Sequence, residues 1–421
     1  MLAVAIESSR GIRDSAQRFL DCDLRTLIIA SATFLRLHIS QVHVNVRGEM
    51  KVAILGTRGI PARYGGFETL AEQLSRRLAA RGHQVTVYCR RPFTTPGDVV
   101  EAGIRRVILP AVSHKYFDTF VHTFLSVMHV LFTDADVVLI CNVANSPWAW
   151  FPRLAGKPTV LNVDGLDRKR RKWNVWGRCF LFLCEALATL TPTRIVTDAR
   201  LVRDYYARRY HKSSTLIAYG AELPPVSDPF DGFGLVPQKF VLYVSRLEPE
   251  NNPELVIRAY RRVQTEWPLV VVGGNPYDAP YVERLKSIAD GRVIFLGPVY
   301  GQGYWQLLKN AGLYVFACEI GGVHPALIEA MAVQKAVLFL DTPENRETVG
   351  DCGLAFRPDE NDLAAKLAAL LRDPTACAEL GRRAGDRAEE QYSWEQVTRN
   401  YEDLFFEMLG PSAARTRSSL S

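Results

Sequence analysis

The sequence predicts an α/β protein built from two Rossmann-like domains, each a parallel sheet with helices on both faces. Three observations support this. From Met50 onward, short apolar runs alternate with segments of helical periodicity. The alternation stops once, in a proline-rich stretch, and then begins again. With 421 residues, the chain suits two domains of about 150 to 200 residues each better than a single core.

Residues 1–49 precede the first regular element and are expected to lie outside the fold. They lack glycine-punctuated strands and helices, whereas "MKVAILGTRGI" at 50–60 is typical of a first strand that runs into a glycine turn. The stretch 25–40 is basic and apolar, but it lies late for a signal peptide and lacks a convincing small-residue cleavage site. Two interpretations stay open: a dispensable extension and a membrane-associating helix.

The first domain is expected over 50–221. It opens with the strand "KVAILG" and a helix over 65–82 that ends at a glycine. Further strands are expected at 83–89, 105–110, 135–142, 158–165 and 193–198.

Residues 222–238, "ELPPVSDPFDGFGLVPQ", are rich in proline and glycine and predict a linker. The second domain is expected over 239–392, followed by an amphipathic helix at 393–409 and a disordered tail at 410–421. Two such domains leave a cleft where the carboxyl ends of both sheets face each other, and ligands are expected there. The strands expected in the second domain are 239–247, 268–274, 292–297, 313–318 and 335–341, and its helices are 252–264, 280–289 and 303–311.

The composition indicates a soluble globular protein, with 48% hydrophobic and 23% charged residues. The net charge of +6 is too small to imply a nucleic-acid partner. The eight cysteines form no CxxC pair and no Cys/His cluster at zinc spacing, which predicts a reducing, cytoplasmic compartment and no metal. No apolar run reaches the roughly 18 to 20 residues that span a bilayer.

The segment "GTRGIPARYGGFE" lies between the first strand and the first helix. Gly65 and Gly66 let the backbone approach a ligand at a helix N-terminus, where free N–H groups favour an anion. The segment is no dinucleotide fingerprint, because G-x-G-x-x-G is missing and the second strand ends without an acid. We expect a phosphate or sugar contact, with Glu68 as a weaker candidate; a plain tight turn is the alternative.

The segment "NVDGLDRKRRKW" follows a strand and combines an acid with a basic run. Asp164 is expected at the carboxyl edge of the sheet, facing the cleft. The basic run predicts contact with an anionic acceptor or a membrane surface, although a solvated face is the commoner meaning of such a run. The residues of this predicted surface are Arg168, Lys169, Arg170, Arg171, Lys172 and Trp173.

Arg246 follows the first strand of the second domain, in "SRLEPENNPE". A guanidinium at this place can bind a diphosphate through two parallel hydrogen bonds. The alternative is an ion pair with Glu248 or Glu250 on the surface.

The segment "EIGGVHPALIEAMA" at 319–332 predicts a helix that begins at its proline. Gly321 and Gly322 can present backbone donors to phosphate oxygens. Glu329 could then accept hydrogen bonds from ribose hydroxyls, unless it only stabilises the helix dipole. His324 is either a cap-like turn residue or a sugar contact, and Glu319 is a weaker candidate.

These motifs, together with "YGAE" at 219–222, resemble the GT-B fold retaining glycosyltransferases that transfer sugars from nucleotide diphosphates, and most of all their bacterial rhamnosyltransferase-like subgroup. The resemblance implies that the terminal helix crosses back to the first domain. It also implies that Gly65 and Gly66 lie near the diphosphate or the acceptor, that Arg246 binds the diphosphate, and that Glu329 binds the ribose.

Two positions depart from the broader family, although the subgroup is similar at both. Gly321 stands eight residues before Glu329, where a glutamate is frequent, and Glu319 is ten before it. Asn251 stands where the family usually has a lysine. A sugar-binding role for Glu319 therefore does not transfer directly, and Arg246 would need help from another cation.

The resemblance implies transfer of a sugar, with rhamnose favoured by the subgroup, to a cell-surface polysaccharide or lipid-linked acceptor at the inner face of the cytoplasmic membrane. It implies retention of configuration, with no metal and no cofactor apart from the donor. If the reaction instead inverts, Asp164 is the expected general base. The alternatives are a GT-B sugar-nucleotide epimerase and a non-catalytic nucleotide-sugar-binding protein; an oxidoreductase is disfavoured because the dinucleotide fingerprint is missing.

Overall fold

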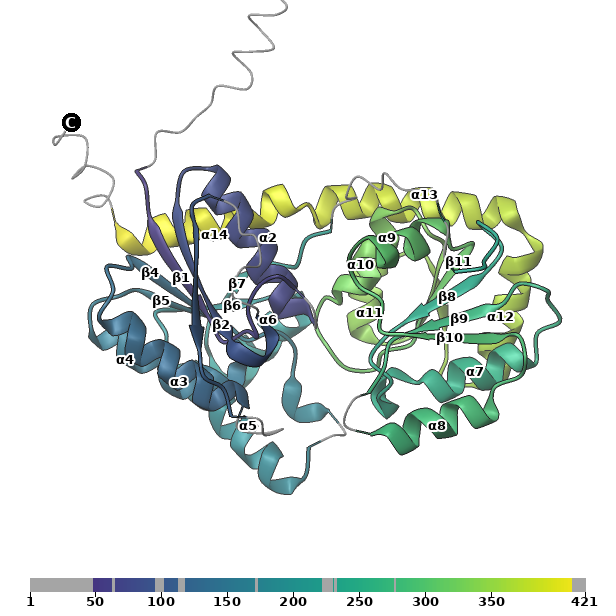
Figure 1. Ribbon diagram of the computed structural model, residues 1–421, viewed down its shortest axis with the longest axis horizontal. Helices are drawn as coiled ribbons and strands as arrows, with labels where there is room; N and C mark the ends of the chain where they lie inside the picture. Colours follow the sequence, from purple (N-terminus) through teal and green to yellow (C-terminus); the bar gives the residue numbers. More distant parts are fainter. Residues whose placement is uncertain are drawn as a thin grey trace, which may run out of the picture. The chain divides into compact units, whose positions relative to one another are not determined.

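The computed structural model describes residues 48–410, except for 63–64, 95–101, 113–117, 171–172, 222–229, 231–232 and 276–277. The predicted extension 1–49 and tail 410–421 therefore lie almost entirely outside the described residues, as does most of the predicted linker. Arg171 and Lys172 also lie outside them. The described chain holds two parallel sheets, and both belong to one compact unit (Figure 1). Each sheet with its covering helices is called a lobe below.

The first lobe contains a seven-stranded parallel sheet in the order β3-β2-β1-β4-β5-β6-β7. Every residue of the central strand β4 is buried, as expected for a strand with helices on both faces of its sheet. The strands are β1 (Lys51–Leu55), β2 (Gln84–Arg90), β3 (Ile104–Leu109), β4 (Val137–Cys141), β5 (Thr159–Asn162), β6 (Arg194–Thr197) and β7 (Thr215–Leu216). The helices are α2 (Gly66–Ala80), α3 (Asp118–Leu131), α4 (Trp150–Leu154), α5 (Val175–Ala188) and α6 (Arg200–Tyr210).

The second lobe contains a six-stranded parallel sheet in the order β10-β9-β8-β11-β12-β13. Its strands are β8 (Val241–Val244), β9 (Leu269–Val272), β10 (Val293–Gly297), β11 (Leu313–Phe316), β12 (Val337–Leu340) and β13 (Leu354–Phe356). Its helices are α7 (Pro253–Arg261), α8 (Ala279–Ile288), α9 (Gly301–Asn310), α10 (Pro325–Ala332), α11 (Pro343–Val349), α12 (Glu360–Arg372) and α13 (Pro374–Gln391). The predicted α/β class with two parallel sheets is thus confirmed. The two- and three-residue strands β7 and β13 were not predicted, because such short strands carry no periodicity.

Both sheets reverse their strand order at one point, between β1 and β4 in the first lobe and between β8 and β11 in the second. Ligands of open parallel sheets bind at the carboxyl ends of the strands beside such a reversal. The glycine segment 56–66 follows β1, Arg246 follows β8, and the segment 319–324 follows β11. The topology therefore puts the motifs singled out from the sequence at the expected binding edges.

The terminal helix α14 (Trp394–Leu409) packs on α2 of the first lobe, and α13 packs on α10 of the second (Figure 1). The predicted crossing helix is therefore confirmed. Glu402 of α14 pairs with Arg81 at 2.5 Å and with His83 at 2.9 Å. Deeper in, the Asn162 amide at the end of β5 donates to the hydroxyl of Tyr401 at 2.8 Å, so α14 supports the edge of the first sheet.

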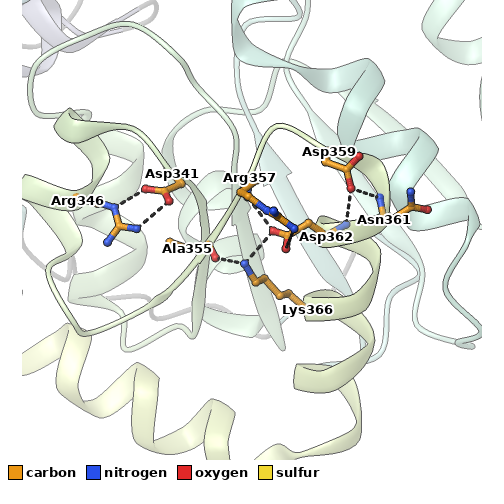
Figure 2. A network of polar contacts seen from close by, with 8 residues as sticks. All are labelled: Asp341, Arg346, Ala355, Arg357, Asp359, Asn361, Asp362 and Lys366. Atoms are coloured by element: carbon orange, nitrogen blue, oxygen red, sulfur yellow. Dashed lines mark hydrogen bonds and ion pairs between the residues drawn. The ribbon is translucent and has the colours of Figure 1, made fainter.

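Polar contacts fix the start of α12 (Figure 2). The Asp359 carboxylate accepts from the backbone N–H groups of Asn361 and Asp362 at 3.0 and 2.9 Å, which satisfies two donors of the first turn. Asp362 in turn accepts from the Lys366 ammonium at 2.8 Å. These pairs lie near the surface, so each contributes at most about 1 kcal/mol.

Candidate functional site

Loops from the two lobes meet at the carboxyl ends of the sheets, and glycines line the contact. A Cβ atom on Gly165 would lie 2.7 Å from the carbonyl carbon of Gly321, so any side chain there would collide with the backbone of the other lobe. A Cβ atom on Gly66 would lie 3.2 Å from Cγ of Pro325, at the start of α10. The structure thus brings together three of the predicted segments, which start near residues 56, 162 and 319.

The His324 imidazole lies against Gly321. A Cβ atom on Gly321 would lie 2.2 Å from Cε1 of the imidazole, and the ring also packs against Phe316 at a centroid distance of 5.0 Å. His324 occupies the N-cap position of α10, as the cap-like interpretation predicts, but its side chain makes no capping bond. Burial lowers its pKa to about 3, with Arg170 and Arg246 adding to the effect. A neutral imidazole between two cations can serve a sugar hydroxyl as donor or acceptor.

Glu329 is half-buried on α10 and receives a hydrogen bond of 2.5 Å from the Tyr304 hydroxyl of α9. It is the fifth residue of the helix, beyond the first turn, so the interpretation as a dipole-stabilising acid is wrong. Burial raises the pKa of Glu329 to about 7, against the bond from Tyr304, which lowers it. One carboxylate oxygen is held by a phenol, and the group titrates near neutral pH. This arrangement suits a hydroxyl-binding carboxylate.

If Glu329 binds the ribose of a sugar donor, as the resemblance implies, its charge should make donor affinity depend on pH. Only the carboxylate accepts two ribose hydroxyls well, and the pKa is about 7. Affinity for a nucleoside-diphosphate sugar should therefore rise as pH increases, by about tenfold between roughly pH 6 and pH 8. Tyr304→Phe removes the bond that lowers the pKa, so the midpoint should move to higher pH. Calorimetric titration over this range measures both effects, and a flat profile in the wild type would remove Glu329 from the site.

Arg246 lies in the turn after β8, with its side chain 35% exposed and its Nη1 3.6 Å from Oε1 of Glu248. The pairing expected as an alternative is therefore present, but it is long and leaves the guanidinium partly open. The backbone oxygen of Arg246 accepts from the Asn251 amide at 2.7 Å. Asn251, which stands in place of the usual lysine, thus holds the turn that presents Arg246.

Arg170 supplies a second cation near His324, and the prediction that it lies on an acceptor or membrane surface is wrong. Its side chain is 11% exposed and pairs with Asp167 of the same loop at 2.7 Å and with Glu250 of the second lobe at 3.2 Å. Burial acts to lower its pKa, but these carboxylates raise it above the ordinary value, so the charge is kept. Arg170 is an ion-paired cation buried where the two lobes meet.

The other residues of the predicted surface lie in different environments. Arg168 pairs with Glu185 of α5 at 2.9 Å and donates to the Tyr205 hydroxyl at 2.7 Å, so it too points partly inward. Trp173 is half-buried and packs against Gly177 at the start of α5. Lys169 lies in a short helix, Asp167–Lys169, and its side chain is outside the described residues, as are Arg171 and Lys172.

Glu68 shapes the loop after β1. Its carboxylate accepts from the Arg58 backbone N–H at 2.7 Å, and Glu72 accepts from Ala62 at the same distance. Glu68 is 7% exposed and holds this loop, and the ligand contact named as a weaker possibility stays a prediction. Gly65 beside it is exposed in extended conformation and is the N-cap of α2.

Glu319 joins the loop after β11 to the turn after β8. Its N–H donates to the Glu250 backbone oxygen at 3.0 Å, and its carboxylate accepts from the Asn252 amide at 3.1 Å. It therefore links two loops that carry predicted donor contacts.

Asp164 lies at the carboxyl end of β5 in a left-handed conformation, with φ at 54°. The Tyr219 hydroxyl lies 3.5 Å from its Oδ1, at the limit of a hydrogen bond. Burial, with Asp167 adding to it, raises the pKa of Asp164. Beside it lies Asp198 at the end of β6, which the sequence reasoning missed. The signal was available, because an acid ends "TRIVTD" just as an acid ends "LNVD" at 161–164.

Among the described residues, no group of three or more His, Cys, Asp or Glu side chains is arranged to hold a metal ion. No helix in the described part of the chain is both long and apolar enough to cross a membrane.

Comparison with known proteins gives two family matches. Residues 64–220 match the model Glycosyltransferase Family 4, and residues 232–391 match Glycosyl transferases group 1. A curated relative is an N-acetylgalactosamine-N,N'-diacetylbacillosaminyl-diphospho-undecaprenol 4-alpha-N-acetylgalactosaminyltransferase of Campylobacter jejuni. It is 31% identical over 140 residues, which are 32% of this chain and 38% of the relative. The chain spans less than half the length of the curated relatives it matches, 38% to 48%.

Solved structures share the fold over most of the chain. Sucrose-phosphate synthase from Thermosynechococcus elongatus superposes with a TM-score of 0.71 at 19% identity, covering 85% of this chain and 98% of its own. Anabaena Alr3699/HepE, solved in complex with UDP and glucose, gives a TM-score of 0.68 at 17% identity, covering 85% and 99%. The chain therefore has the GT-B fold, with a region in its first lobe that matches Glycosyltransferase Family 4 and a region in its second lobe that matches Glycosyl transferases group 1.

Proposed function

We propose that the chain is a glycosyltransferase that moves a sugar from a nucleoside-diphosphate donor to a polysaccharide or lipid-linked acceptor. The observation that carries this is the grouping of Arg246, the glycine pair 321–322 and Glu329 around the start of α10, at the strand-order reversal of the second sheet. The solved relative in complex with UDP and glucose, and the curated relative named for a diphospho-undecaprenol substrate, support the donor and acceptor classes. Rhamnose is the sugar that the sequence resemblance favours.

In this scheme the second lobe holds the donor. Arg246 and the amides of the glycine pair take the diphosphate, while Glu329 takes the ribose hydroxyls. The bond between the sugar C1 and the phosphate oxygen breaks, and C1 bonds to the acceptor oxygen on the same face. The acceptor's proton passes to the departing phosphate oxygen, so no enzyme nucleophile is needed. Positioning and stabilisation of the diphosphate charge then supply most of the rate, without a metal.

An inverting reaction is the second candidate, and Asp164 is its basis. The raised pKa of Asp164 at the edge of the first lobe suits a group that accepts a proton from the acceptor hydroxyl. In that case C1 is attacked from the face opposite the phosphate, and the carboxylate takes the proton.

Incubation with labelled UDP-, GDP- and dTDP-sugars and a polyprenyl-diphosphate-linked saccharide tests the proposed function. We expect sugar transfer with one donor, in the presence of EDTA, and a product with the donor's anomeric configuration by NMR. An inverted anomer would favour Asp164 as base, and loss of turnover in EDTA would contradict the metal-free scheme. Donor binding without transfer to any acceptor would favour the non-catalytic alternative.

The peripheral membrane contact that we propose is best supported by helix α5, not by the basic run as a whole. Val175, Trp176, Phe180 and Leu183 are 72%, 82%, 40% and 56% exposed and recur at helical spacing, so they form one apolar stripe. Beside the stripe lies a surface hollow of about 590 Å³ lined by Arg168, Val175, Arg178, Cys179 and Phe182. Exposed aromatic and aliphatic side chains next to arginines fit the interface of an anionic bilayer.

The double variant Trp176→Glu/Leu183→Glu should weaken binding to vesicles of phosphatidylglycerol and phosphatidylcholine by at least about tenfold, because it loses two large apolar groups and adds repulsion. Co-sedimentation measures this. Phe132→Glu is the matched control, since Phe132 is 91% exposed in the turn after α3 and its change should leave binding within about twofold. Equal binding of all three proteins would mean that α5 does not face the membrane.

A further inference from the structure

The carboxylate of Asp198 joins the two lobes at the glycine pair. Asp198 follows β6 of the first lobe and is 1% exposed. Its Oδ2 accepts a hydrogen bond of 2.7 Å from the backbone N–H of Val323, in the loop of the second lobe that leads into α10. A Cβ atom on Gly322 would lie 2.0 Å from the same oxygen, so only glycine lets the carboxylate reach this amide.

The second oxygen of Asp198 has no donor. Among the residues that the structure describes, no N–H or O–H group bonds to its buried Oδ1. The carboxyl group of Asp164, from the neighbouring strand end, lies within hydrogen-bonding reach of Asp198. Two carboxylates in such contact do not both ionise at low cost, so one proton lies between them. A protonated Asp164 or Asp198 supplies the missing hydrogen bond.

We propose that Asp198 is a positioning residue that clamps the glycine pair 321–322 to the first lobe, through the Val323 amide and a proton shared with Asp164. The clamp preorganises the loop that takes the diphosphate, so it strengthens nucleoside-diphosphate binding without touching the ligand. The role in binding rests on the proposed function, whereas the clamp itself does not.

The clamp should weaken as pH rises. Burial and the neighbouring Asp164 raise the pKa of Asp198 well above its ordinary value, and burial raises that of Asp164. Raised carboxyl pKa values mean that the shared proton stabilises the joined state at low pH and that this stabilisation is lost as pH rises through the raised values. Arg170 opposes this by favouring the ionised form of Asp164. The charged and titratable groups that face the pair are Cys141, Asp167, Arg170, Tyr219 and Tyr401.

Three substitutions distinguish the loss of the clamp from the loss of the carboxylate charge. In Asp198→Asn the amide oxygen still accepts from Val323, and the amide N–H₂ donates to an ionised Asp164, so the clamp remains and needs no proton. In Asp198→Ala both bonds are lost and the Val323 N–H is left unpaired. Gly322→Ala disrupts the contact between Asp198 and Val323 from the side of the second lobe, because the added methyl group would overlap the Asp198 carboxylate.

Hydrogen exchange of the segment 319–328, without any ligand, tests the clamp. We expect the protection factor at Val323 to fall at least about tenfold in Asp198→Ala and in Gly322→Ala, and to stay within about threefold of the wild type in Asp198→Asn. Protection should fall with rising pH in the wild type and remain constant in Asp198→Asn. Wild-type protection in both Asp198→Ala and Gly322→Ala would overturn the proposal. If one of the two variants does not fold, wild-type protection in the other alone would overturn it.

Titration with UDP, GDP and dTDP tests the consequence for binding. We expect the dissociation constant to rise about tenfold in Asp198→Ala and to change less than about twofold in Asp198→Asn. Equal affinity of Asp198→Ala and the wild type would overturn the positioning role. If no nucleotide binds the wild type but exchange at Val323 responds as expected, the proposed function fails and the clamp stands.

Discussion

Arg246→Ala should lower kcat/KM for the sugar donor by about 10²- to 10³-fold, because in the proposed scheme it removes the cation that stabilises the departing diphosphate. The Asn251 amide bonds to the Arg246 backbone, so the turn should persist after the side chain is shortened. Steady-state kinetics with the donor identified by the labelled-sugar assay measures the loss. The effect should appear in kcat as well as in KM, since the charge develops as the bond breaks.

Two further variants show whether the loss in Arg246→Ala comes from the guanidinium group of Arg246. Arg246→Lys keeps the charge but loses the two-pronged donor, so an intermediate loss is expected. Arg258→Ala is the matched control, because Arg258 lies on α7 and pairs with Glu254 away from α10. Activity of Arg246→Ala within about threefold of the control would exclude Arg246 from the diphosphate site.

Arg170→Met should reduce the free energy of unfolding by about 3 to 5 kcal/mol, the cost of leaving buried carboxylates without their cation. Glu250 is 1% exposed, and Arg170 reaches it from the other lobe at 3.2 Å. Methionine replaces the aliphatic stem of arginine, so lost packing of the stem contributes little. Urea denaturation of the full chain, followed by circular dichroism and tryptophan fluorescence, measures the change.

The matched control is Arg194→Met, whose pair with Glu407 also joins distant parts of the chain at 3.2 Å but lies exposed. Its loss should cost less than about 1 kcal/mol. Equal effects of the two substitutions would mean that Arg170 is solvated, and the original interpretation of a surface charge run would then be correct.

The fold was readable from the sequence because each strand is a short apolar run between helical segments, a local pattern. The helix at 393–409 was predicted almost to the residue, since its apolar face is long and ends at Gly410. The candidate donor segment was readable for a similar reason: glycines, a proline and an acid follow one another at a helix start. For the secondary structure and for the candidate donor segment alike, the residues that form the pattern are near neighbours in the sequence.

The partners of the site residues could not be read in this way, because they come from distant parts of the chain. Arg170 looked solvated within five basic residues, and only the fold brings Glu250 to it, 80 positions away. Tyr304 reaches Glu329 across 25 positions, and Asp198 reaches Val323 across 125. Asn251 also gains its role only in three dimensions, as the residue that holds the Arg246 turn.

The most direct test of the donor site is a calorimetric titration of UDP, GDP and dTDP, near pH 8, into the wild type and Glu329→Gln. We predict that one nucleotide binds the wild type and binds Glu329→Gln at least about tenfold more weakly, because the amide cannot replace a carboxylate that accepts from both ribose hydroxyls. The proposed donor-binding site at α10 would be contradicted if none of the three nucleotides binds, or if the two proteins bind a nucleotide with equal affinity.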